Sequence, residues 1–517
     1  MTPHSEAERT YRALADLDRY CYISRSHERI TAGGQPVPGA TLLAMAAPLP
    51  PEKLGSPRFA RDHGVRYPYM AGSMAGGIAS TGLVAALAEA GCLASFGAAG
   101  LPADRIDAAL ADLDRTLNGL PYASNLIHTP QRPRWEREVI DVYLHRRLRC
   151  VEASAFVSLS PELVRYRLSG LRADPVGGVR AENRVIAKVS RAEVAECFLR
   201  PAPEALVAEL LADGKVTAEQ ARLAESVPMA DDITVEADSG GHTDRRPLAV
   251  LVPQMLRLRD RFRIGRRPHP VRVGAAGSIG TPQAVYAAFA LGAEYVVTGS
   301  VNQACVEAGT SPAAKALLAQ AGPVDCAMAP AADMFETGAE VQVLRKGTLF
   351  AQRASHLSRL YRRYDRIEDL PESERERLRA QIFHDGLDQA WDRTAAYLRE
   401  HEPAELTRAD ADPRHRMALL FRSYLGLSSR KAVLGAEEQV CDYQIWCGPA
   451  MGAFNLWARG TALEPIEHRR VADVAGHLLR GAAFHARVAQ LRFAGVRIPA
   501  GCAEYRLPPL REPLLTG

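Results

Sequence analysis

Residues 271–300 read VRVGAAGSIGTPQAVYAAFALGAEYVVTGS, which is an apolar run, a helix-like segment and a second apolar run. Thr281 suits the N-cap of the helix and Pro282 its first position, where the missing amide of proline costs no hydrogen bond. Both apolar runs end in small residues, GAAGS and TGS. The stretch therefore predicts two parallel strands joined by a crossover helix.

The same pattern recurs along the chain from residue 67 to residue 300. Short apolar runs close on Gly, Ser, Asn, His or an acid, and helix-like segments separate them. Their number favours an α/β fold of the (β/α)8 TIM barrel type, with an open doubly wound sheet as the alternative. In a barrel, the residues that close each run share one mouth, where active sites are built. The runs occupy residues 67–77, 92–100, 122–130, 150–157, 183–190, 232–242, 271–280 and 294–300.

Two segments do not fit a plain barrel. The segment 191–230 is broken at Pro201 and Pro203 and predicts a helical insertion of more than one helix, which could form a lid or wall beside the mouth. The region after residue 330 is mainly helical in pattern. We therefore expect an N-terminal segment (1–60), a barrel (61–330) and a mainly helical substrate or partner region (331–517).

Composition limits the classes of partner. The 517 residues carry a net charge of only +4, with basic and acidic residues interleaved, so neither a nucleic acid nor a membrane surface is expected as a partner. The N-terminus lacks the pattern of a signal peptide and no apolar run has the length of a membrane span, so we expect a cytoplasmic protein. The 9 cysteines form no CxxC pair, so we expect reduced thiols and no metal site.

The ends of the seventh and eighth expected strands predict a phosphate-binding site. In barrels, a phosphate commonly lies beside the loops after these two strands, where backbone amides and a helix N-terminus can bind it. The residues concerned are Gly277, Ser278, Gly299 and Ser300.

A family resemblance rests on five motifs. They are MAGG (74–77), NLIH (125–128), EADSGGHTD (236–244), GAAGSIGTP (274–282), and TGS (298–300) followed by NQACVEAGTS (302–311). Together they resemble the FMN-dependent barrels of the nitronate monooxygenase and enoyl reductase superfamily, and within it the PfaD-type trans-acting enoyl reductases of polyketide and polyunsaturated fatty acid synthases. The segments 329–354, 360–365 and 442–457 extend the resemblance and look like parts that plain nitronate monooxygenases lack. One departure is Ser278, where the family usually has glycine.

The resemblance implies FMN as cofactor, NADPH as hydride donor and an enoyl thioester on an acyl carrier protein as substrate. It places the backbone of Gly72, Ser73 and Met74 against the flavin ring and Asn125 at its pyrimidine edge. It also adds Gly240 and Gly241 to the phosphate site. Lys188 could stabilise negative charge on the reduced flavin, or it could simply form an ion pair with Glu152 or Glu236.

His242 is the candidate catalytic residue, together with Lys188. An imidazole can donate a proton near neutral pH, and enoyl reduction requires a proton at the α carbon after hydride has reached the β carbon. Asp238 and Asp244 would act as orienting or capping groups rather than as catalytic acids. His128 is a second candidate for the catalytic residue at the same mouth. The alternative is a structural histidine.

Three functions remain as alternatives from the sequence. An enoyl reductase would reduce a tethered acyl chain, a nitronate monooxygenase would oxidise a small nitroalkane on the same flavin, and a docking protein would catalyse nothing. For the enoyl reductase, the stretch 353–366 places four arginines at spacings of three and four, which could form a docking face for an acidic carrier protein; they are Arg359, Arg362, Arg363 and Arg366. The alternative is an ordinary solvated helix face. A homodimer is also left open.

Overall fold

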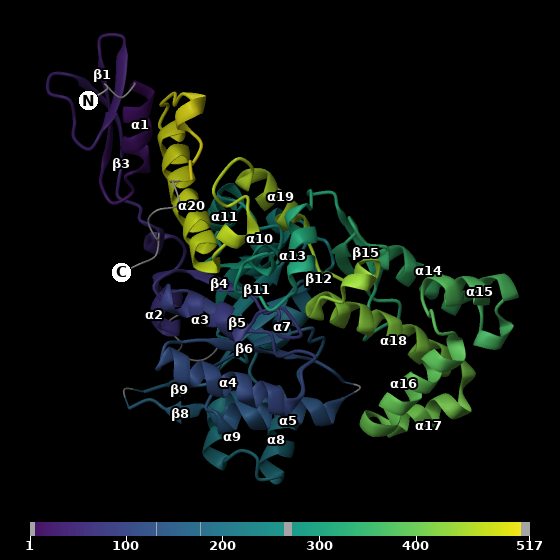
Figure 1. Cartoon of the computed structure of the whole chain (residues 1–517). Coiled ribbons are helices and arrows are strands. Elements are labelled where there is room, and N and C mark those ends of the chain that lie inside the picture. The colour runs from purple at the N-terminus through teal and green to yellow at the C-terminus, as the bar shows by residue number, and fades with distance from the viewer. Residues whose placement is uncertain (1–5, 131, 176, 263–270, 508–517) are drawn as a thin grey trace. The chain divides into compact units, whose positions relative to one another are not determined.

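The computed structural model describes residues 6–130, 132–175, 177–262 and 271–507, which divide into two compact units (Figure 1). The first unit comprises Met1–Asp238, Asp244–Gly309 and Leu456–Gly517, and the second comprises Ser239–Thr243 and Thr310–Asn455. This division differs from the expected one, because residues 456–517 group with the barrel and residues 310–330 do not. Five residues of the loop that contains His242 also belong to the second unit.

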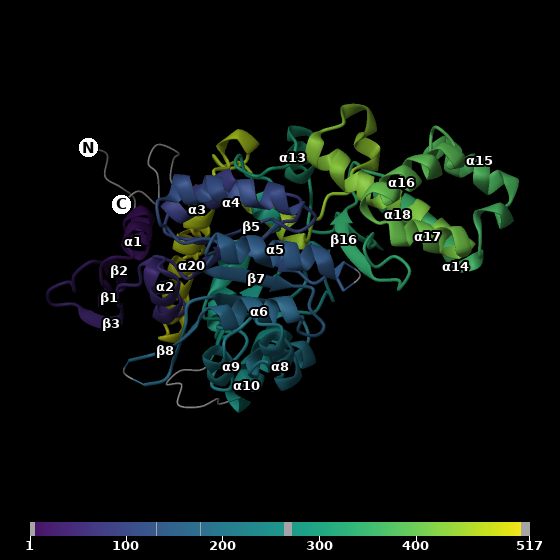
Figure 2. The same ribbon diagram turned by 90° about the horizontal axis from the view of Figure 1, so that it is seen from below.

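The first unit is built on a closed barrel of parallel strands in the order β10-β11-β13-β14-β4-β5-β6-β7 (Figures 1 and 2). Each strand lies within one of the runs predicted from the sequence, so the predicted TIM barrel is confirmed. The strands are buried along almost their whole length, as expected for a parallel sheet covered by helices. Their bounds are β4 (Tyr69–Ala71), β5 (Leu93–Phe96), β6 (Ala123–Ile127), β7 (Cys150–Ser154), β10 (Arg184–Val189), β11 (Asp232–Glu236), β13 (Arg272–Ala276) and β14 (Val296–Thr298).

Two of the crossover helices begin at the caps that the sequence indicates. The Thr281 hydroxyl accepts a hydrogen bond from the amide of Ala284, with Pro282 in the first turn, and the Ser80 hydroxyl accepts one from the amide of Leu83. The helices between barrel strands include α3 (Thr81–Glu89), α4 (Ala103–Leu117), α5 (Pro133–His145), α6 (Pro161–Ser169), α7 (Ala192–Leu199), α10 (Leu248–Arg261) and α11 (Pro282–Ala290), while α2 (Pro57–His63) precedes the first strand and the short α12 (Ser300–Gln303) follows the last.

The insertion between β10 and β11 contains α7, α8 (Glu204–Ala212) and α9 (Ala218–Ala224). Helices α8 and α9 pack on α6, and α9 also contacts β8 (Leu171–Ala173), which forms a hairpin with β9 (Val179–Ala181) (Figure 1). This hairpin follows α6 in the chain, so it lies toward the end of the barrel at which the strands begin. The expected lid or wall beside the mouth is therefore wrong.

The N- and C-terminal parts of the chain pack together in the first unit. An antiparallel sheet, in the order β2-β1-β3, and α1 (Glu6–Ala15) contact the long helix α20 (Val471–Phe493), which also packs on α11. The guanidinium of Arg487 is buried and donates to the backbone oxygens of Leu14, Asp16, Leu17, Arg19 and Ala47. These contacts explain why the C-terminal segment belongs to the first unit. The strands are β1 (Cys21–Ser26), β2 (Arg29–Gly33) and β3 (Thr41–Ala46).

The second unit combines a small antiparallel sheet with helices. The sheet has the order β12-β16-β15, and its core includes Phe335, Phe350, Phe421 and Tyr424. Its elements are β12 (Gly241–His242), β15 (Cys326–Pro330), β16 (Glu340–Leu344), α13 (Pro312–Ala319), α14 (Phe350–Arg363), α15 (Glu372–Gln381), α16 (Leu387–His401), α17 (Pro403–Ala411) and α18 (Pro413–Leu434), while α19 (Pro449–Ala458) runs from this unit into the first. Short 3-10 helices are η1 (Pro51–Lys53), η2 (Ile367–Asp369), η3 (Glu437–Asp442), η4 (Ile466–His468) and η5 (Ala500–Cys502). Across the described ranges, none of the helices has the length and apolar character needed to cross a membrane.

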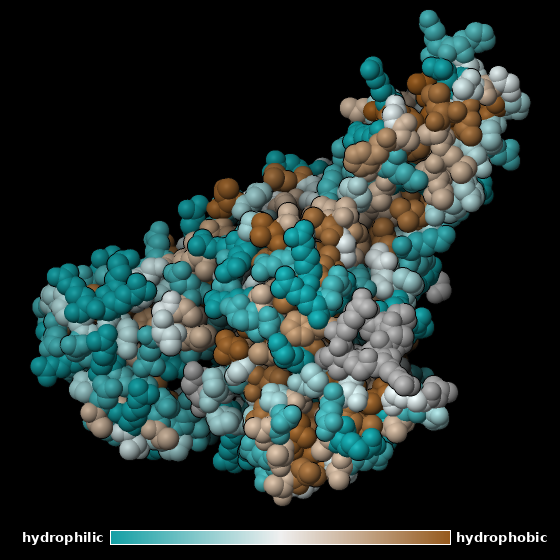
Figure 3. Space-filling view, turned by 180° about the vertical axis from the view of Figure 1, so that it is seen from behind, coloured by the Kyte–Doolittle hydropathy of each residue, from teal (hydrophilic) through white to brown (hydrophobic). Residues whose placement is uncertain are grey.

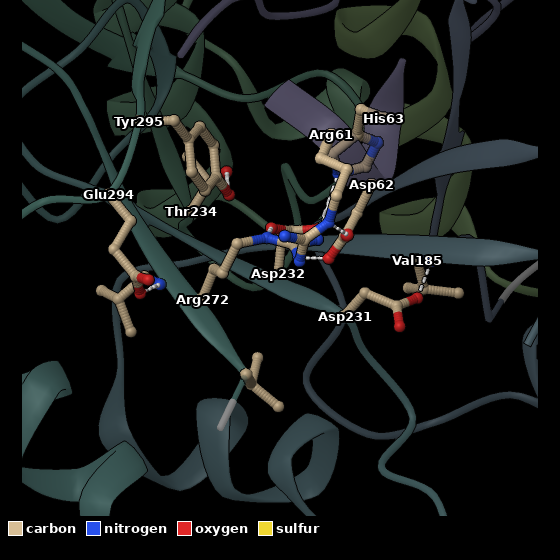
Figure 4. Close-up of polar contacts among 12 residues, drawn as sticks. Arg61, Asp62, His63, Val185, Asp231, Asp232, Thr234, Arg272, Glu294 and Tyr295 are labelled. Atoms are coloured by element: carbon tan, nitrogen blue, oxygen red, sulfur yellow. Dashed lines mark hydrogen bonds and ion pairs between the residues drawn. The ribbon is translucent and has the colours of Figure 1, made fainter. Parts of the chain in front are cut away.

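A buried ion pair lies at the end of the barrel where the strands begin (Figure 4). Asp232 is the first residue of β11 and Arg272 the first of β13, and the guanidinium donates to both carboxylate oxygens at 2.5 and 2.8 Å. The Nε2 atom of His63, in α2, lies 2.8 Å from the same carboxylate, and Arg272 also reaches Asp62 at 2.5 Å. Burial raises the pKa of Asp232, but Arg272 and His63 outweigh it and hold the pKa below its ordinary value.

Removing this cation should destabilise the barrel. We expect Arg272→Leu to lower the free energy of unfolding by about 3–5 kcal/mol, because it leaves a buried carboxylate without its main partner. Urea unfolding followed by far-UV circular dichroism measures the change. Because the pKa of Asp232 is lowered in the folded state, its contribution is complete above the unfolded value of about 3.9 and is lost as the pH falls through the folded value.

The difference between parent and variant should therefore be largest near neutral pH and shrink in acid below about pH 4. Arg115→Leu is the matched control, since Arg115 is 80% exposed and pairs with Asp112 on the surface. It should change the free energy of unfolding by no more than about 0.5 kcal/mol. Equal effects of the two variants would contradict the role given to the buried pair.

Candidate active site

Three charged side chains lie together near the C-terminal ends of the strands. The ammonium of Lys188, on β10, lies 2.6 Å from a carboxylate oxygen of Glu236, the last residue of β11. Glu152, on β7, is buried and also acts on the charge of Lys188. The ion pair considered as an alternative from the sequence is thus confirmed for Glu236.

The two carboxylates decide the ionisation of Lys188. Burial lowers the pKa of the ammonium, but Glu236 and Glu152 outweigh burial and raise the pKa above its ordinary value. Lys188 is therefore protonated at neutral pH. It can stabilise a negative charge or donate a hydrogen bond, but it cannot accept a proton as a general base.

Asn125 is buried on β6, in register with Glu152 on β7. Its Oδ1 atom accepts a hydrogen bond from the amide of Ala99 at 3.1 Å. Because that backbone group can only donate, the contact fixes the orientation of the side-chain amide. The Nδ2 group is then the one that can donate to a ligand.

The loop after β4 brings backbone close to these side chains. The amide of Ser73 donates to Glu152 at 2.9 Å, and the amide of Gly72 donates to the carbonyl of Thr298 at 2.9 Å. A Cβ atom on Gly72 would lie 3.0 Å from Val297. Gly72, Ser73 and the adjoining Met74 therefore lie at the strand ends with Asn125 and Lys188, and their contact with a flavin ring stays a prediction.

The predicted phosphate-binding residues lie after β13 and β14. Gly277 has φ +87° and Ser278 φ +55°, so both adopt the left-handed conformation that favours glycine. The Ser278 hydroxyl donates to the carbonyl of Asp238 at 3.0 Å. Gly299 is the N-cap of α12, which begins at Ser300.

These residues fit a flavin phosphate. A Cβ atom on Gly299 would meet nothing within 4 Å, so open space adjoins the backbone at the start of α12. A Cβ atom on Gly277, by contrast, would lie 2.6 Å from the backbone of Ala237. The loops after β13 and β14 could thus hold the phosphate of a flavin. Asn125, Lys188 and the backbone of residues 72–74, at other strand ends, could contact the rest of it.

Gly240, Gly241 and His242 belong to the second unit, where β12 pairs with β16. The side chain of His242 is 40% exposed, and its Nε2 atom lies 3.3 Å from Asp333. The participation of these three residues in the site of the barrel stays a prediction. Asp244 belongs to the first unit and pairs with Arg191.

The remaining candidates occupy different environments. His128 stacks on Phe156 with 4.7 Å between ring centroids, and its Nδ1 atom lies 3.3 Å from Glu136, so its ring is held by packing. Arg359, Arg362 and Arg363 are exposed on α14 in the second unit.

Two contacts at these sites escaped sequence reasoning. The hydrogen bond from Ser73 to Glu152 joins a backbone group to a side chain on another strand, which periodicity does not reveal. One signal was present: Glu152 is the third residue of its strand, as Asn125 is of its own. Asp333, which contacts His242, lies in a loop and had no comparable signal.

Two family models match the chain. Residues 57–358 match nitronate monooxygenase, and residues 364–443 match the inserted helical domain of acyl-carrier-protein S-malonyltransferase. The first match includes residues 329–354, which we expected to lie outside plain nitronate monooxygenases. That expectation is therefore wrong.

Two of the curated relatives illustrate matches to longer proteins. It is 46% identical over 448 residues to a polyunsaturated fatty acid synthase protein of Thraustochytrium sp., covering 85% of this chain and 30% of that protein. It is 44% identical over 430 residues to polyketide biosynthesis protein PksE of Bacillus subtilis, covering 83% of this chain and 56% of that protein. The chain thus spans less than two thirds of either relative.

One solved structure is similar to most of this chain, including parts of both units. The enoyl reductase domain of MlnA, from the macrolactin biosynthesis cluster of Bacillus amyloliquefaciens, is similar with a TM-score of 0.81 and 38% identity, over 86% of this chain and 99% of that one. FabK from Thermotoga maritima, at 20% identity and a TM-score of 0.51, shares the fold. With more than half of its residues matched by the family model, the chain belongs to the nitronate monooxygenase family.

Proposed function

We propose that this chain is an FMN-dependent enoyl reductase that uses NADPH to reduce the α,β double bond of an enoyl thioester bound to an acyl carrier protein. The observation that carries the proposal is the similarity to the enoyl reductase domain of MlnA, which extends over 99% of that domain. The names of the synthase relatives support a tethered acyl chain as the substrate.

The barrel residues would bind and orient the cofactor. FMN, when bound, would supply hydride transfer between the nicotinamide and the enoyl group. The backbone at Gly277, Ser278, Gly299 and Ser300 would bind its phosphate, and the Nδ2 group of Asn125 would donate to its pyrimidine edge. The positive charge of Lys188 would stabilise negative charge that develops at the site.

His242 would protonate the substrate. Addition of hydride at the β carbon of an enoyl thioester leaves an enolate, which needs a proton at the α carbon. An imidazolium can supply this proton near neutral pH. The exposure of the ring allows the proton to be replaced from solvent.

A carrier protein would dock on the second unit. Residues 364–443 match a helical domain named for an acyl-carrier-protein transferase, and the adjoining helix α14 exposes Arg359, Arg362 and Arg363. Other arginines of the stretch 353–366 are engaged, since Arg353 pairs with the buried Asp442 and Arg366 with Asp369. The surface of these helices is mainly hydrophilic, as the left side of Figure 3 shows. Such a surface suits a transient, electrostatic complex.

The name of the matched family favours a second candidate, oxidation of a small nitroalkane. Anaerobic reduction of the purified protein by NADPH, followed by reoxidation with a crotonyl-loaded carrier protein, tests the first proposal. Reoxidation by the enoyl thioester supports an enoyl reductase. Turnover of nitroethane with oxygen, without reoxidation by the thioester, would establish the monooxygenase instead.

The open space at Gly299 allows a specific test of flavin binding. We expect the parent to purify with one FMN per chain and Gly299→Leu to purify without it, because the new side chain fills the space beside the start of α12. Absorbance at flavin wavelengths and circular dichroism of the same sample measure occupancy and folding. Gly277→Leu is a poorer test, since a side chain there collides with Ala237 whether or not flavin is bound.

Gly426→Leu provides the matched control for Gly299→Leu. Gly426 is exposed on α18, and a Cβ atom there also meets nothing within 4 Å. This variant should keep its full complement of flavin. Normal flavin content in a folded Gly299→Leu protein would remove Gly299 from the cofactor site.

Charge reversal on α14 tests the docking face. We expect the double variant Arg362→Glu and Arg363→Glu to raise the KM for a carrier-bound enoyl substrate at low salt, because surface charge acts mainly on association. Reduction of a free pantetheine thioester should be unchanged. The control is Arg115→Glu on α4, an exposed arginine of the first unit, which should leave the KM unchanged. Unchanged kinetics with the carrier-bound substrate across the salt series would show that docking occurs elsewhere.

A further inference from the structure

A single hairpin of the second unit fixes the backbone around His242. Strands β15 and β16 form this hairpin, and β16 also pairs with β12, with His242 opposite Val341. The side-chain amide of Gln342, also on β16, donates to the carbonyl of Ser239 at 2.8 Å. The backbone of the histidine therefore has little freedom to move along the sheet.

The backbone of residues 447–448 also lies close to this segment. A Cβ atom on Gly240 would lie 2.8 Å from the nitrogen of Cys447, and a Cβ atom on Gly448 would lie 2.7 Å from the nitrogen of Gly240. Two glycines are thus needed for this close approach of chain to chain. His242 thus follows directly from a segment in close contact with residues 447–448, which adjoin β16 themselves through Cys447 and Gln342.

The same hairpin carries a charged side chain that contacts the imidazole. Within the described residues, it is the one ion-pair partner of His242. Asp333 lies in the loop between β15 and β16, and its Oδ1 atom is 3.3 Å from the Nε2 atom of His242. The Nε2 atom is shielded from solvent and makes no hydrogen bond in the described contacts, so Asp333 acts on it as a nearby charge, although 40% of the side chain is exposed. The exposed part of the ring is therefore the part that does not face Asp333.

The loop that carries Asp333 is held in place. Arg422 donates to the carbonyl of Ala332 at 2.9 Å, the amide of Ala331 donates to the carbonyl of Ala339 at 2.9 Å, and Phe335 is buried in the core. Burial raises the pKa of Asp333, but His242 and Arg422 outweigh it and hold the pKa below its ordinary value. Asp333 is therefore an anion at neutral pH.

We propose that Asp333 is the positioning residue of His242, which holds the proton on Nε2 and leaves Nδ1 as the atom that exchanges a proton with the substrate. The inference rests on the proposed function, because it concerns the proton donor of that reaction. A carboxylate beside one ring nitrogen selects the tautomer and stabilises the imidazolium, as in other acid–base sites.

The proton balance is complete without a further reactant. The imidazolium carries protons on both nitrogens, and the Nδ1–H bond breaks as a C–H bond forms at the α carbon of the enolate. The ring is then neutral, with its remaining proton on Nε2 facing Asp333. Solvent returns a proton to Nδ1, because the ring is partly exposed.

Kinetics of four proteins test the positioning role: the parent, Asp333→Asn, His242→Gln and the double variant. We expect Asp333→Asn to lower kcat roughly 10–10²-fold, a moderate loss for a misplaced acid, and to leave KM and the reduction of flavin by NADPH unchanged. His242→Gln should lose roughly 10²–10⁴-fold. In the double variant, Asp333→Asn should cause no further loss, because its effect passes through the histidine.

A second readout does not depend on turnover. Nitrogen-15 chemical shifts of the imidazole, assigned by the signals that disappear in His242→Gln, report which ring nitrogen carries the proton. We expect the Nε2–H tautomer in the parent and a changed tautomer in Asp333→Asn. Asp385→Asn is the control, since Asp385 is exposed in the same unit and pairs only at the surface with Arg393 in the described contacts.

The outcomes separate this inference from the proposed function. An unchanged tautomer in Asp333→Asn, or losses of the two single variants that multiply in the double variant, would overturn the positioning role. Absence of enoyl reduction in the parent, with the tautomer shift intact, would overturn the proposed reaction and keep the contact between Asp333 and His242.

Discussion

The barrel depends on a single buried carboxylate, that of Asp232, at the end where the strands begin. It binds Arg272 at the start of β13 and His63 in the helix before β4, so one anion connects neighbouring strands to the helix that precedes the first strand of the barrel. A charge this deeply buried is tolerated only when paired. Since the pairing lies at the opposite end from the mouth, the residues at the mouth are free to be selected for chemistry.

The charged side chains at the mouth are paired differently: one ammonium, that of Lys188, lies near two carboxylates. Glu236 and Glu152 both act on the charge of Lys188 and hold the pKa of its ammonium above the ordinary value, so the ammonium stays protonated. Such an arrangement stabilises the ammonium in a fixed position and disfavours its deprotonation. The carboxylate of Glu152 also accepts a hydrogen bond from the amide of Ser73, so it orients the loop after β4 as well. Electrostatics and backbone position are therefore set by the same residues.

The sequence contained the information for the barrel but not for the limits of the units. Alternation of apolar runs and helices is a local property, so the strands and the Thr281 cap could be predicted. The packing of α20 on α11 joins distant segments, and no local pattern reveals it. The insertion at 191–230 was wrongly expected at the mouth for the same reason. Among the site residues, side chains at strand ends were predictable, whereas the contact of His242 with Asp333 was not.

The stretch EADSGGHTD shows why the histidine was the hardest residue to interpret. Glu236 is part of the barrel, whereas His242, a few residues later, belongs to the second unit, where β16 fixes its backbone and Asp333 contacts its ring. The position of the imidazole is therefore set by the β15–β16 hairpin and the core under it, including Phe335. Substitutions in that core would alter the histidine without changing a residue of the barrel. The second unit thus contributes more than a surface for a partner, because it determines the geometry of the proposed proton donor.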